Sequence, residues 1–292
     1  MLTTHHLRPA IAIGLIGAAA LSGCGTADSG GASHHSRRNV AHSAGGQPTF
    51  SHPLQIRNSM FPLRPGTEFV YSGRIVEGGK STTHSVRFTV TDLSKVVDGV
   101  RTAVAWDRDF QAGELTEQEL AFFAEDDKGN VWNFGEYPEE FEDGKFTGAP
   151  DTWIKDTAGA YGGRHMLARP AVGAQYREGL VPTIKFNDMS KVTATGRKTC
   201  VPTGCYRGVL LVTEWSPNDS AGGTQLKYYA PGVGLVRVGA HGGDSREYLT
   251  LAAVRHLDSA GIAAVRKAVL AMERRAYRIS AVYRQTRPAV RR

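Results

Sequence analysis

Residues 85–107 read SVRFTVTDLSKVVDGVRTAVAWD, and this stretch decides the fold. In its first half, apolar residues alternate with polar ones, at Val86, Phe88 and Val90. Asp98-Gly99 then supplies the residues that a tight hairpin turn needs. After the turn, a second run places four residues on one side: Val100, Thr102, Val104 and Trp106. A period of two residues is typical of β-strands, so the stretch predicts two antiparallel strands joined by a hairpin.

Similar runs extend in both directions and are separated by turn residues. They cover residues 67–75, 119–124, 131–134, 184–186, 191–195, 209–215, 226–229, 235–238 and 248–254. Short strands at this spacing, without helical periods between them, predict a mainly β domain over residues 49–258. We expect an antiparallel meander that forms a curved sheet or an open barrel. Residues 137–175 are glycine-rich and weakly patterned, which predicts a long excursion or an insertion over one face.

The C-terminal part follows a helical period. Apolar residues recur at alternating spacings of three and four: Ile262, Val265, Val269, Met272, Ala276, Ile279 and Tyr283. The spacing predicts an amphipathic helix over residues 259–285, with Ser259 as its cap. The narrow apolar face can dock on the domain, pair with another helix or lie on a membrane. We expect residues 286–292 to form a disordered tail.

The N-terminus has the plan of a bacterial signal peptide over residues 1–23. Arg8 precedes an uncharged apolar run over residues 10–20, which is too short to span a membrane as a helix. Leu21-Ser22-Gly23-Cys24 resembles the lipobox of bacterial lipoproteins. The resemblance implies cleavage before Cys24, lipidation (diacylglycerol and palmitate) of its sulfur, and anchoring to the extracytoplasmic face of the cell membrane. The alternative is an ordinary secretory peptide with an incidental cysteine.

Residues 24–48 are rich in glycine, serine, alanine and histidine and carry no apolar period. This composition predicts a flexible tether behind the lipidated cysteine. Four histidines lie in or beside it and could bind a metal: His34, His35, His42 and His52. A solvated linker is the preferred interpretation, because a disordered chain lacks the second shell that fixes imidazole ligands.

Only one cysteine pair remains once Cys24 is lipidated. Cys200 and Cys205 flank a Pro-Thr-Gly turn, and an exported protein lies in a compartment where disulfides persist. We therefore expect a structural disulfide between them. Redox and zinc roles are less favoured, because the spacing is not Cys-x-x-Cys and a zinc site would need two further ligands.

Charge is unevenly distributed along a chain that holds 35 basic and 28 acidic residues. Residues 107–151 contain fourteen acidic and three basic side chains, which predicts a partly acidic domain surface. Residues 255–292 contain ten basic and two acidic side chains. Because an exported protein rarely meets nucleic acid, we expect no nucleic acid partner, and anionic lipid or wall polymer is the favoured counter-charge. The candidate contacts on the helix are Arg266, Lys267, Arg274, Arg275 and Arg278.

Motifs for chemistry are weak. Glu139-Glu140 could supply a carboxylate pair for glycoside hydrolysis, but the turn-rich context favours a solvated face. Asp126-Asp127-Lys128-Gly129-Asn130 has oxygen ligands but lacks the spacing and terminal glutamate of an EF-hand loop, so a hairpin turn is favoured over weak calcium binding. The domain's other histidines fall in no metal-ligand array: His84, His165, His241 and His256. We therefore expect no catalytic residue, metal or cofactor in the domain.

Three strings are distinctive: residues 61–66 (FPLRPG), 129–136 (GNVWNFGE) and 228–237 (YYAPGVGLVR). Together they resemble a group of uncharacterised exported bacterial proteins, many of them lipoproteins of Gram-positive actinobacteria. The resemblance covers roughly residues 60–255 and implies a shared β-fold without a settled activity. In outline the chain also resembles periplasmic lipoprotein carriers with a curved sheet around an apolar cavity.

The sequence therefore predicts a non-enzymatic envelope lipoprotein that binds an apolar or amphiphilic ligand, or a protein partner. Aromatic-rich strands favour this prediction, at residues 131–134, Trp215 and Tyr228-Tyr229. Such residues bind a ligand if they lie on a concave face and serve packing if they lie in a closed core. The alternative is a cell-wall polysaccharide hydrolase that uses surface carboxylates.

Overall fold

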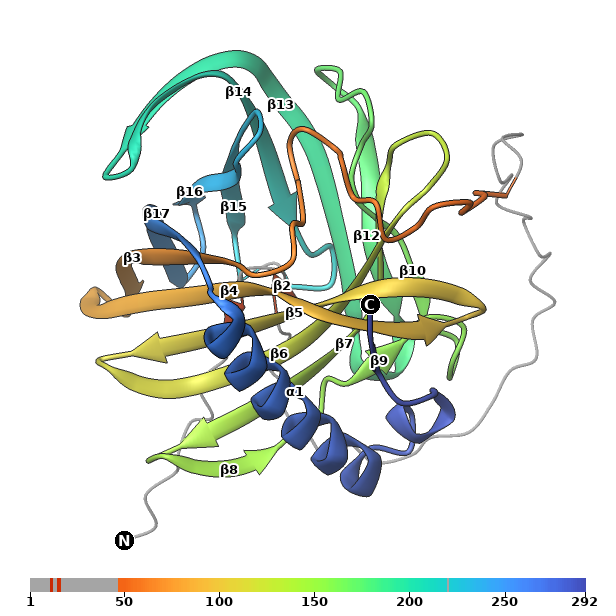
Figure 1. The fold of residues 1–292 in the computed structure, drawn as a ribbon. Coiled ribbons are helices and arrows are strands. Elements are labelled where there is room, and N and C mark those ends of the chain that lie inside the picture. Colours follow the sequence, from red (N-terminus) through yellow and green to blue (C-terminus); the bar gives the residue numbers. More distant parts are fainter. Residues whose placement is uncertain (1–10, 13–14, 17–46, 220) are drawn as a thin grey trace, which may run out of the picture.

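The computed structural model describes residues 11–12, 15–16, 47–219 and 221–292 (Figure 1). Cys24 and almost all of the predicted tether lie outside these residues. The described chain is mainly β with one α-helix, as the sequence predicts. Two short strands, β1 (Ile11–Ala12) and β2 (Leu15–Ile16), pair only with each other. No helix in the described part of the chain is long and apolar enough to cross a membrane.

All other strands belong to one antiparallel sheet that is not closed into a barrel. Its strands in chain order are β3 (Thr67–Glu77), β4 (Lys80–Val97), β5 (Val100–Gln111), β6 (Glu114–Glu125), β7 (Val131–Glu142), β8 (Lys145–Gly148), β9 (Trp153–Ile154), β10 (Tyr161–Gly162), β11 (Arg164–Met166), β12 (Gln175–Val181), β13 (Phe186–Val201), β14 (Gly204–Trp215), β15 (Thr224–Ala230), β16 (Gly234–His241), β17 (Ser245–His256) and β18 (Val290–Arg291). A short 3-10 helix, η1 (Pro182–Ile184), precedes β13.

The strand order is β10-β12-β13-β14-β15-β16-β17-β3-β4-β5-β6-β7-β11. The predicted meander is therefore confirmed, with one addition: the late strand β17 pairs with the early strand β3 along its whole length. The two ends of the order, β10 and β11, are neighbours in sequence. Between them, the Gly163 N–H donates to the Glu178 carbonyl of β12, and the Asn133 N–H of β7 donates to the Gly163 carbonyl. The segment 161–166 thus spans the space between the sheet's two ends.

The β4–β5 hairpin forms where the sequence predicts it. Val97 pairs with Val100, and the turn residues Asp98 and Gly99 both have positive φ, of 46° and 72°. These are the backbone angles that make Asp-Gly favourable in two-residue hairpin turns. Along β5, Ala103 and Ala105 face one hydrophobic cluster, while the alternate residues face a second cluster on the opposite side of the sheet.

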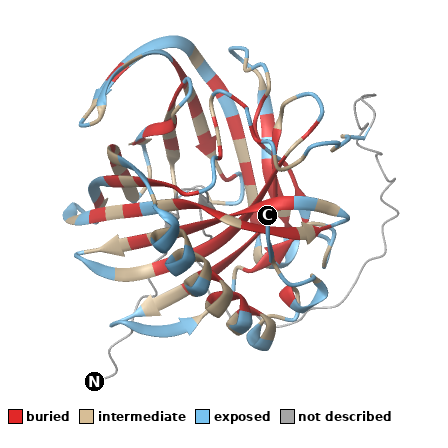
Figure 2. Cartoon of the chain, in the orientation of Figure 1, coloured by how far each residue is buried: buried red, intermediate tan, exposed pale blue. Residues whose placement is uncertain are grey.

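The two clusters lie on opposite faces of the curved sheet, and strands β4–β7 are buried on both (Figure 2). The inner cluster fills the concave side. The outer cluster lies between these strands and helix α1 (Ser259–Ile279) (Figure 1). The helix begins after Asp258, whose side chain accepts a hydrogen bond from the Gly261 N–H at 2.7 Å. Asp258 rather than the predicted Ser259 is therefore the cap.

Docking on the domain is the arrangement that the helix adopts. Four residues of the predicted apolar face are buried in the outer cluster: Val269, Met272, Ala276 and Tyr283. Ile279 is instead 47% exposed, because α1 ends there and not at residue 285. Ser280 is extended, and the chain continues through a 3-10 turn, η2 (Tyr283–Gln285), which returns Tyr283 to the sheet.

The expected disorder of residues 286–292 is not what the structure shows. β18 pairs with Leu93 and Ser94 of β4. This edge is available because β4 has eighteen residues, whereas β3 pairs with it only as far as Thr89. The Lys95 ammonium group also donates to the Arg287 carbonyl at 2.7 Å. A free edge and a buried cation therefore order a segment whose composition alone suggests a solvated tail.

Residues 137–175 also differ from the expected excursion over one face. β7 continues to Glu142, and β8, β9 and β11 all pair with β7, while β10 pairs with β12. The segment therefore extends the sheet and brings its two ends together. Its strands have two to four residues, too few for an alternating pattern to be recognised in the sequence.

Candidate functional site

The concave side of the sheet is apolar at one end of its strands and polar at the other. Eight buried carboxyl groups occupy inward positions on six strands: Asp107, Asp109, Glu117, Glu119, Glu136, Glu178, Glu214 and Glu247. We call these eight residues the acidic cluster. Three basic side chains lie among them and are also buried: His84, His165 and Lys227. A buried excess of carboxyl groups is costly, so its presence points to a function.

The period-two geometry of strands gathers the cluster. On β5, Asp107 and Asp109 continue the inward face that begins with Ala103 and Ala105. On β6, Glu119 pairs with Asp107 and Glu117 pairs with Asp109 across the antiparallel ladder. Four carboxyl groups therefore form a square on two neighbouring strands. Like charges at directly opposed positions repel each other, so packing alone does not favour this arrangement.

A pocket lies at the boundary between the apolar and polar ends, with about 590 Å³ of space not filled by protein atoms, part of it open to solvent. Its apolar wall includes Phe61, Leu63, Phe69, Phe88, Phe123 and Leu235. Its polar wall includes Asp107, Glu119, Asn133, Glu136 and His165. The two walls together suit a molecule with one apolar and one polar part.

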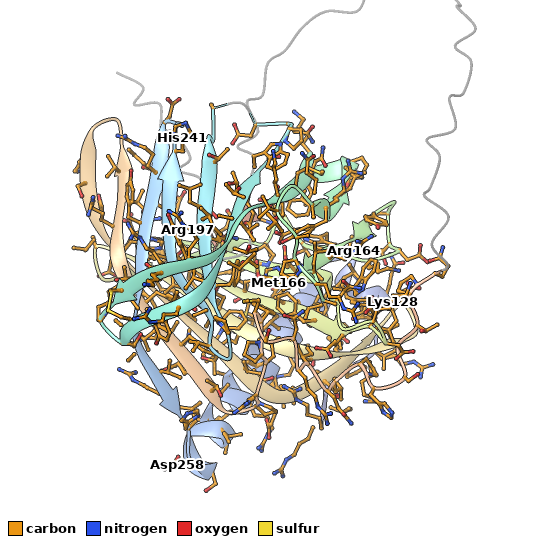
Figure 3. All side chains as sticks on the ribbon, turned by 90° about the horizontal axis from the view of Figure 1, so that it is seen from above. Lys128, Arg164, Met166, Arg197, His241 and Asp258 are labelled. Carbon is orange, nitrogen blue, oxygen red and sulfur yellow. A yellow bond between two sulfur atoms is a disulfide. The ribbon has the colours of Figure 1, made fainter. Side chains whose placement is uncertain are left out.

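Segment 61–63 and β11 position the wall of the pocket. Phe61 precedes β3 and packs on the His165 ring at 4.3 Å between centroids, and on Phe123 at 5.3 Å. His165 lies between Arg164 and Met166 on β11, and Met166 is fully buried. Figure 3 shows Met166 near the middle of the molecule, whereas Lys128, His241 and Asp258 lie at its periphery. The pocket wall is therefore built from segments about a hundred residues apart.

Burial controls the electrostatics of the polar wall. Desolvation, with a contribution from Asp109, raises the pKa of Asp107 to about 8. Desolvation likewise raises the pKa of Glu136 to about 8, against the hydrogen bonds that it accepts from Asn133 and Trp153. At neutral pH these groups hold protons unless a positive group approaches. The wall can thus donate hydrogen bonds when protonated and bind a cation when ionised.

Glu119 differs from the other pocket carboxyl groups. It is 4% exposed, lines the pocket, and has no side-chain hydrogen-bond partner among the residues that the structure describes. Desolvation raises its pKa well above the usual value, and the nearby Glu136 and Glu117 raise it further. A buried carboxyl group without a partner is expensive, and a ligand group that donates to it would remove that cost.

The basic side chains balance only part of the cluster. Lys227 is fully buried and forms an ion pair with Glu214. His165 Nδ1 lies 3.0 Å from Glu178 Oε2, and burial lowers the pKa of His165 to about 4. The imidazole of His165 is therefore neutral at pH 7 and adds no positive charge to the pocket.

Most aromatic residues singled out in the sequence lie elsewhere. Tyr229 lines the pocket, but Trp132 and Phe134 belong to the outer cluster. The pocket's aromatic wall comes instead from single phenylalanines at inward positions of their strands, including Phe69, Phe88 and Phe123. Alternation within each strand indicates which way such residues point. It does not indicate which strands share a cavity.

The expected acidic surface is corrected by the structure. Seven of the fourteen acidic residues between positions 107 and 151 are buried: Asp107, Asp109, Glu117, Glu119, Asp126, Glu136 and Glu139. Glu139, expected on a solvated face, is 0% exposed and forms an ion pair with Arg275 of α1. Glu139 and Glu140 do not share a cleft in this geometry, because neighbouring residues of a strand point to opposite faces. This pair therefore gives no support to the hydrolase alternative.

Two other predicted features are present. Cys200 and Cys205 face each other at the β13–β14 hairpin and form a disulfide. Asp126 closes the turn before β7, where its carboxylate accepts hydrogen bonds from the backbone N–H groups of Lys128 and Asn130 and from the Trp132 indole. The Asp126 oxygens thus serve the turn.

The basic residues of α1 divide into two groups. Arg266 binds Asp92 of β4 with three hydrogen bonds of 2.5–3.0 Å, and Arg275 binds Glu139. Lys267, Arg274 and Arg278 are exposed. Docking therefore uses two of the five candidate contacts and leaves three on the outer surface of the helix.

Comparisons with known proteins identify no family. No protein-family profile matches the chain, and no curated protein sequence matches it. Two solved structures are similar. One is an inferred exported protein with a YmcC-like fold from Bacteroides fragilis NCTC 9343, at 14% identity and a TM-score of 0.40. The other is an inferred lipoprotein from Parabacteroides distasonis ATCC 8503, at 13% identity and a TM-score of 0.32. Each likeness covers 68% of this chain and 99% of the other.

Proposed function

We propose that the protein is an exported lipoprotein, held on the extracytoplasmic face of the cell membrane through Cys24, that binds an amphiphilic ligand inside its curved sheet. The observation that carries the binding function is the pocket with an aromatic wall on one side and buried carboxyl groups on the other. The lipobox-like Leu21-Ser22-Gly23-Cys24 supports the location. A carrier or receptor is favoured over a hydrolase, because the pocket suits a small ligand.

The polar end of the ligand is a cationic or hydrogen-bond-donating group, such as an amine. Glu119, Glu136 and Asp107 face the pocket together, and the neutral His165 beside them adds no positive charge when they ionise. An ammonium group placed here would gain charge-assisted hydrogen bonds. A carboxylate or phosphate head would meet like charge as soon as these carboxyl groups ionise, so we expect it to bind more weakly.

Native mass spectrometry tests the proposed binding. A soluble form that starts at residue 47 keeps the contacts of Phe50 with Phe134 and of Ser51 with Asp127, and it can be exported behind a cleavable signal. We expect a co-purifying small molecule, or saturable binding of an added alkylamine. The alcohol and the fatty acid of the same chain length should bind progressively more weakly. Equal binding of all three would contradict the proposed head-group chemistry, and no binding would contradict the pocket's function.

Matched variants locate the site. Glu119→Gln removes the carboxylate facing the pocket, whereas Glu114→Gln changes an exposed residue of the same strand. We expect the first change to weaken alkylamine binding by roughly tenfold or more, since charged hydrogen bonds contribute about 1.5–3 kcal/mol. The second should leave binding unchanged. Binding that is insensitive to both would place the ligand outside the pocket.

The lipid anchor is tested in cells with the full chain. Growth with a clickable fatty acid should label the wild type and fractionate it with membranes. Cys24→Ala should remove the label. Persistent labelling of the variant would place the lipid elsewhere, and absence of label from the wild type would favour an ordinary secreted protein.

The exposed basic surface supports a second membrane contact, with anionic lipid. Lys267, Arg274 and Arg278 lie on the solvent side of α1. Reversing these three charges to Glu tests the contact without removing the helix, whose buried residues hold it on the sheet. We expect the unlipidated wild type, but not the triple variant, to bind vesicles containing phosphatidylglycerol at low salt. Equal binding by both proteins would contradict the contact.

A further inference from the structure

We infer that His84 and Glu247 bind a divalent transition metal ion such as Zn²⁺, with His84 Nδ1 and Glu247 Oε1 as the protein ligands. The two side chains come from β4 and β17, which lie on either side of β3. The site is in the acidic cluster but outside the wall of the pocket, so it stands independently of the proposed amphiphile.

The distance between the two ligand atoms fits a shared cation. His84 Nδ1 and Glu247 Oε1 lie 3.3 Å apart, yet they form no hydrogen bond, and each is a buried atom without a hydrogen-bond partner. Two donors bound tetrahedrally at about 2.0–2.1 Å from one zinc ion lie about 3.3 Å from each other. A metal ion between them would satisfy both atoms. Without one, the two atoms attract each other only when the His84 imidazole is protonated.

Each ligand is held by a second residue, as in metal sites. The other ring nitrogen of His84, Nε2, lies 2.6 Å from Asp109 Oδ1. This contact makes Nε2 the protonated nitrogen and leaves Nδ1 as the metal ligand. The other oxygen of Glu247, Oε2, accepts a hydrogen bond from the Gln225 amide at 3.0 Å. Glu247 is thereby fixed so that Oε1 faces His84.

One strand, β3, lies between the two ligands. Gly73 of β3 pairs with His84 on one side and with Leu249 of β17 on the other. A Cβ atom at Gly73 would meet the Tyr248 backbone of β17, so β3 and β17 pack closely here, and the two ligand atoms lie 3.3 Å apart across β3. His84, Asp109 and Glu247 are all buried, with potential ligand atoms within 4.8 Å of one another. Two protein donors leave coordination positions for water or for a donor atom of a small molecule.

The surrounding charge also favours a cation. Asp107, Glu117 and Glu214 lie in the same acidic cluster, and Lys227 already pairs with Glu214. Hard oxygen ligands alone would suit Ca²⁺ or Mg²⁺, but an imidazole ligand shifts the preference toward Zn²⁺ and its neighbours in the transition series. The site therefore favours Zn²⁺ or a similar transition metal ion over the alkaline-earth ions Ca²⁺ and Mg²⁺.

Zinc titration of the full mature chain tests the site. The tether histidines could bind zinc separately, so the background carries His34→Ala, His35→Ala and His42→Ala. After chelator treatment, calorimetry with ZnCl₂ should show one saturable site. Glu247→Gln and His84→Gln should each weaken it at least tenfold, and Asp109→Asn should weaken it by 10–100-fold, as second-shell changes do. His165→Gln is the matched control, because His165 is also buried beside a carboxylate.

Spectroscopy of the background protein tests the site without altering it, so the result does not depend on whether the variants fold. Zinc K-edge absorption spectroscopy of the background protein should show imidazole scattering and a first shell of nitrogen and oxygen only. Absence of saturable binding, a shell without imidazole, or equal affinity of Glu247→Gln and the background would overturn the proposal. Any of these results would favour a protonated, metal-free His84 between the carboxylates of Asp109 and Glu247. Loss of binding on removal of the tether histidines alone would assign the zinc to the tether and would also overturn it.

Discussion

Arg275 of α1 and Glu139 of β7 form a bidentate ion pair across the helix–sheet interface. Nε donates to Oε1 at 2.9 Å and Nη2 donates to Oε2 at 2.6 Å. The Glu139 carboxylate is 0% exposed and also accepts hydrogen bonds from Gln118 and Tyr137. This pair, together with Arg266 and Asp92, fixes the position of the helix along the outer face of the sheet.

Removing Arg275 should therefore destabilise the fold. Arg275→Met leaves Glu139 buried without its cationic partner, and we expect the free energy of unfolding to fall by about 3 kcal/mol. Urea denaturation measures the change. Arg274→Met, one residue away and exposed, is the control and should change it by less than about 0.5 kcal/mol. Equal losses in the two variants would show that the ion pair does not hold the helix.

The sequence predicts the fold class well because periodicity is a local property. The alternation at residues 85–107 and the Asp98-Gly99 turn are sufficient for the β4–β5 hairpin. The pairing of β17 with β3 is not local: it joins strands about 180 residues apart, so no turn signal reports it. The ordered C-terminus is missed for a similar reason. Its partner is an edge of β4 that exists only after β3 has paired.

Only part of the candidate site can be predicted from the sequence. Asp107 and Asp109 keep the same period as Ala103 and Ala105, and this alternation already places them on the inward side of β5. The acidic composition of residues 107–151 nevertheless suggests a solvated surface, because buried carboxylates are rare. What the sequence lacks is the curvature that brings inward positions of β4, β5 and β17 within reach of one another. His84, Asp109 and Glu247 are therefore brought together by the fold and form no motif that can be recognised in the sequence.

Gly73 should tolerate no side chain. A Cβ atom at this position would lie 1.7 Å from the Tyr248 carbonyl oxygen of the neighbouring strand. We expect Gly73→Ala to lower the free energy of unfolding by more than about 3 kcal/mol, or to abolish soluble expression, because the clash is with backbone. Gly239→Ala on β16 is the matched control, where the nearest atom would lie 3.8 Å away. Denaturation of Gly73→Ala at the wild-type urea concentration would contradict the packing of β3 against β17.

Glu136 should make the fold less stable as pH rises. Burial raises its pKa in the folded state to about 8, above the ordinary value of 4.5 that the unfolded chain retains. Between these values the folded protein holds a proton that the unfolded chain has released. The free energy of unfolding therefore falls with increasing pH, by at most about 1.4 kcal/mol per pH unit for one proton, and levels off above about pH 8.

Glu136→Gln isolates this contribution. Gln keeps the shape of the side chain but carries no titrating proton. The slope of the free energy of unfolding against pH between 5 and 8 should therefore become shallower by up to about 1.4 kcal/mol per pH unit, the value for one proton. Glu142→Gln, exposed at the end of the same strand, should leave the slope unchanged. Urea titrations at several pH values measure both slopes. A slope unaltered by Glu136→Gln would mean that the group is ionised in the folded protein.

Binding of an alkylamine should show the opposite dependence on pH. An ammonium group favours the ionised form of Glu136, so binding at neutral pH displaces a proton from the carboxyl group, whose pKa is about 8. The affinity should therefore increase from about pH 6 to about pH 8, by at most tenfold per pH unit if one proton is released. Calorimetry in buffers of different ionisation enthalpy counts the released protons directly. The number of protons released on binding should fall in Glu136→Gln and should stay unchanged in Glu142→Gln. An affinity that is constant over this range would show that the ligand's polar group lies away from the carboxyl groups of the pocket.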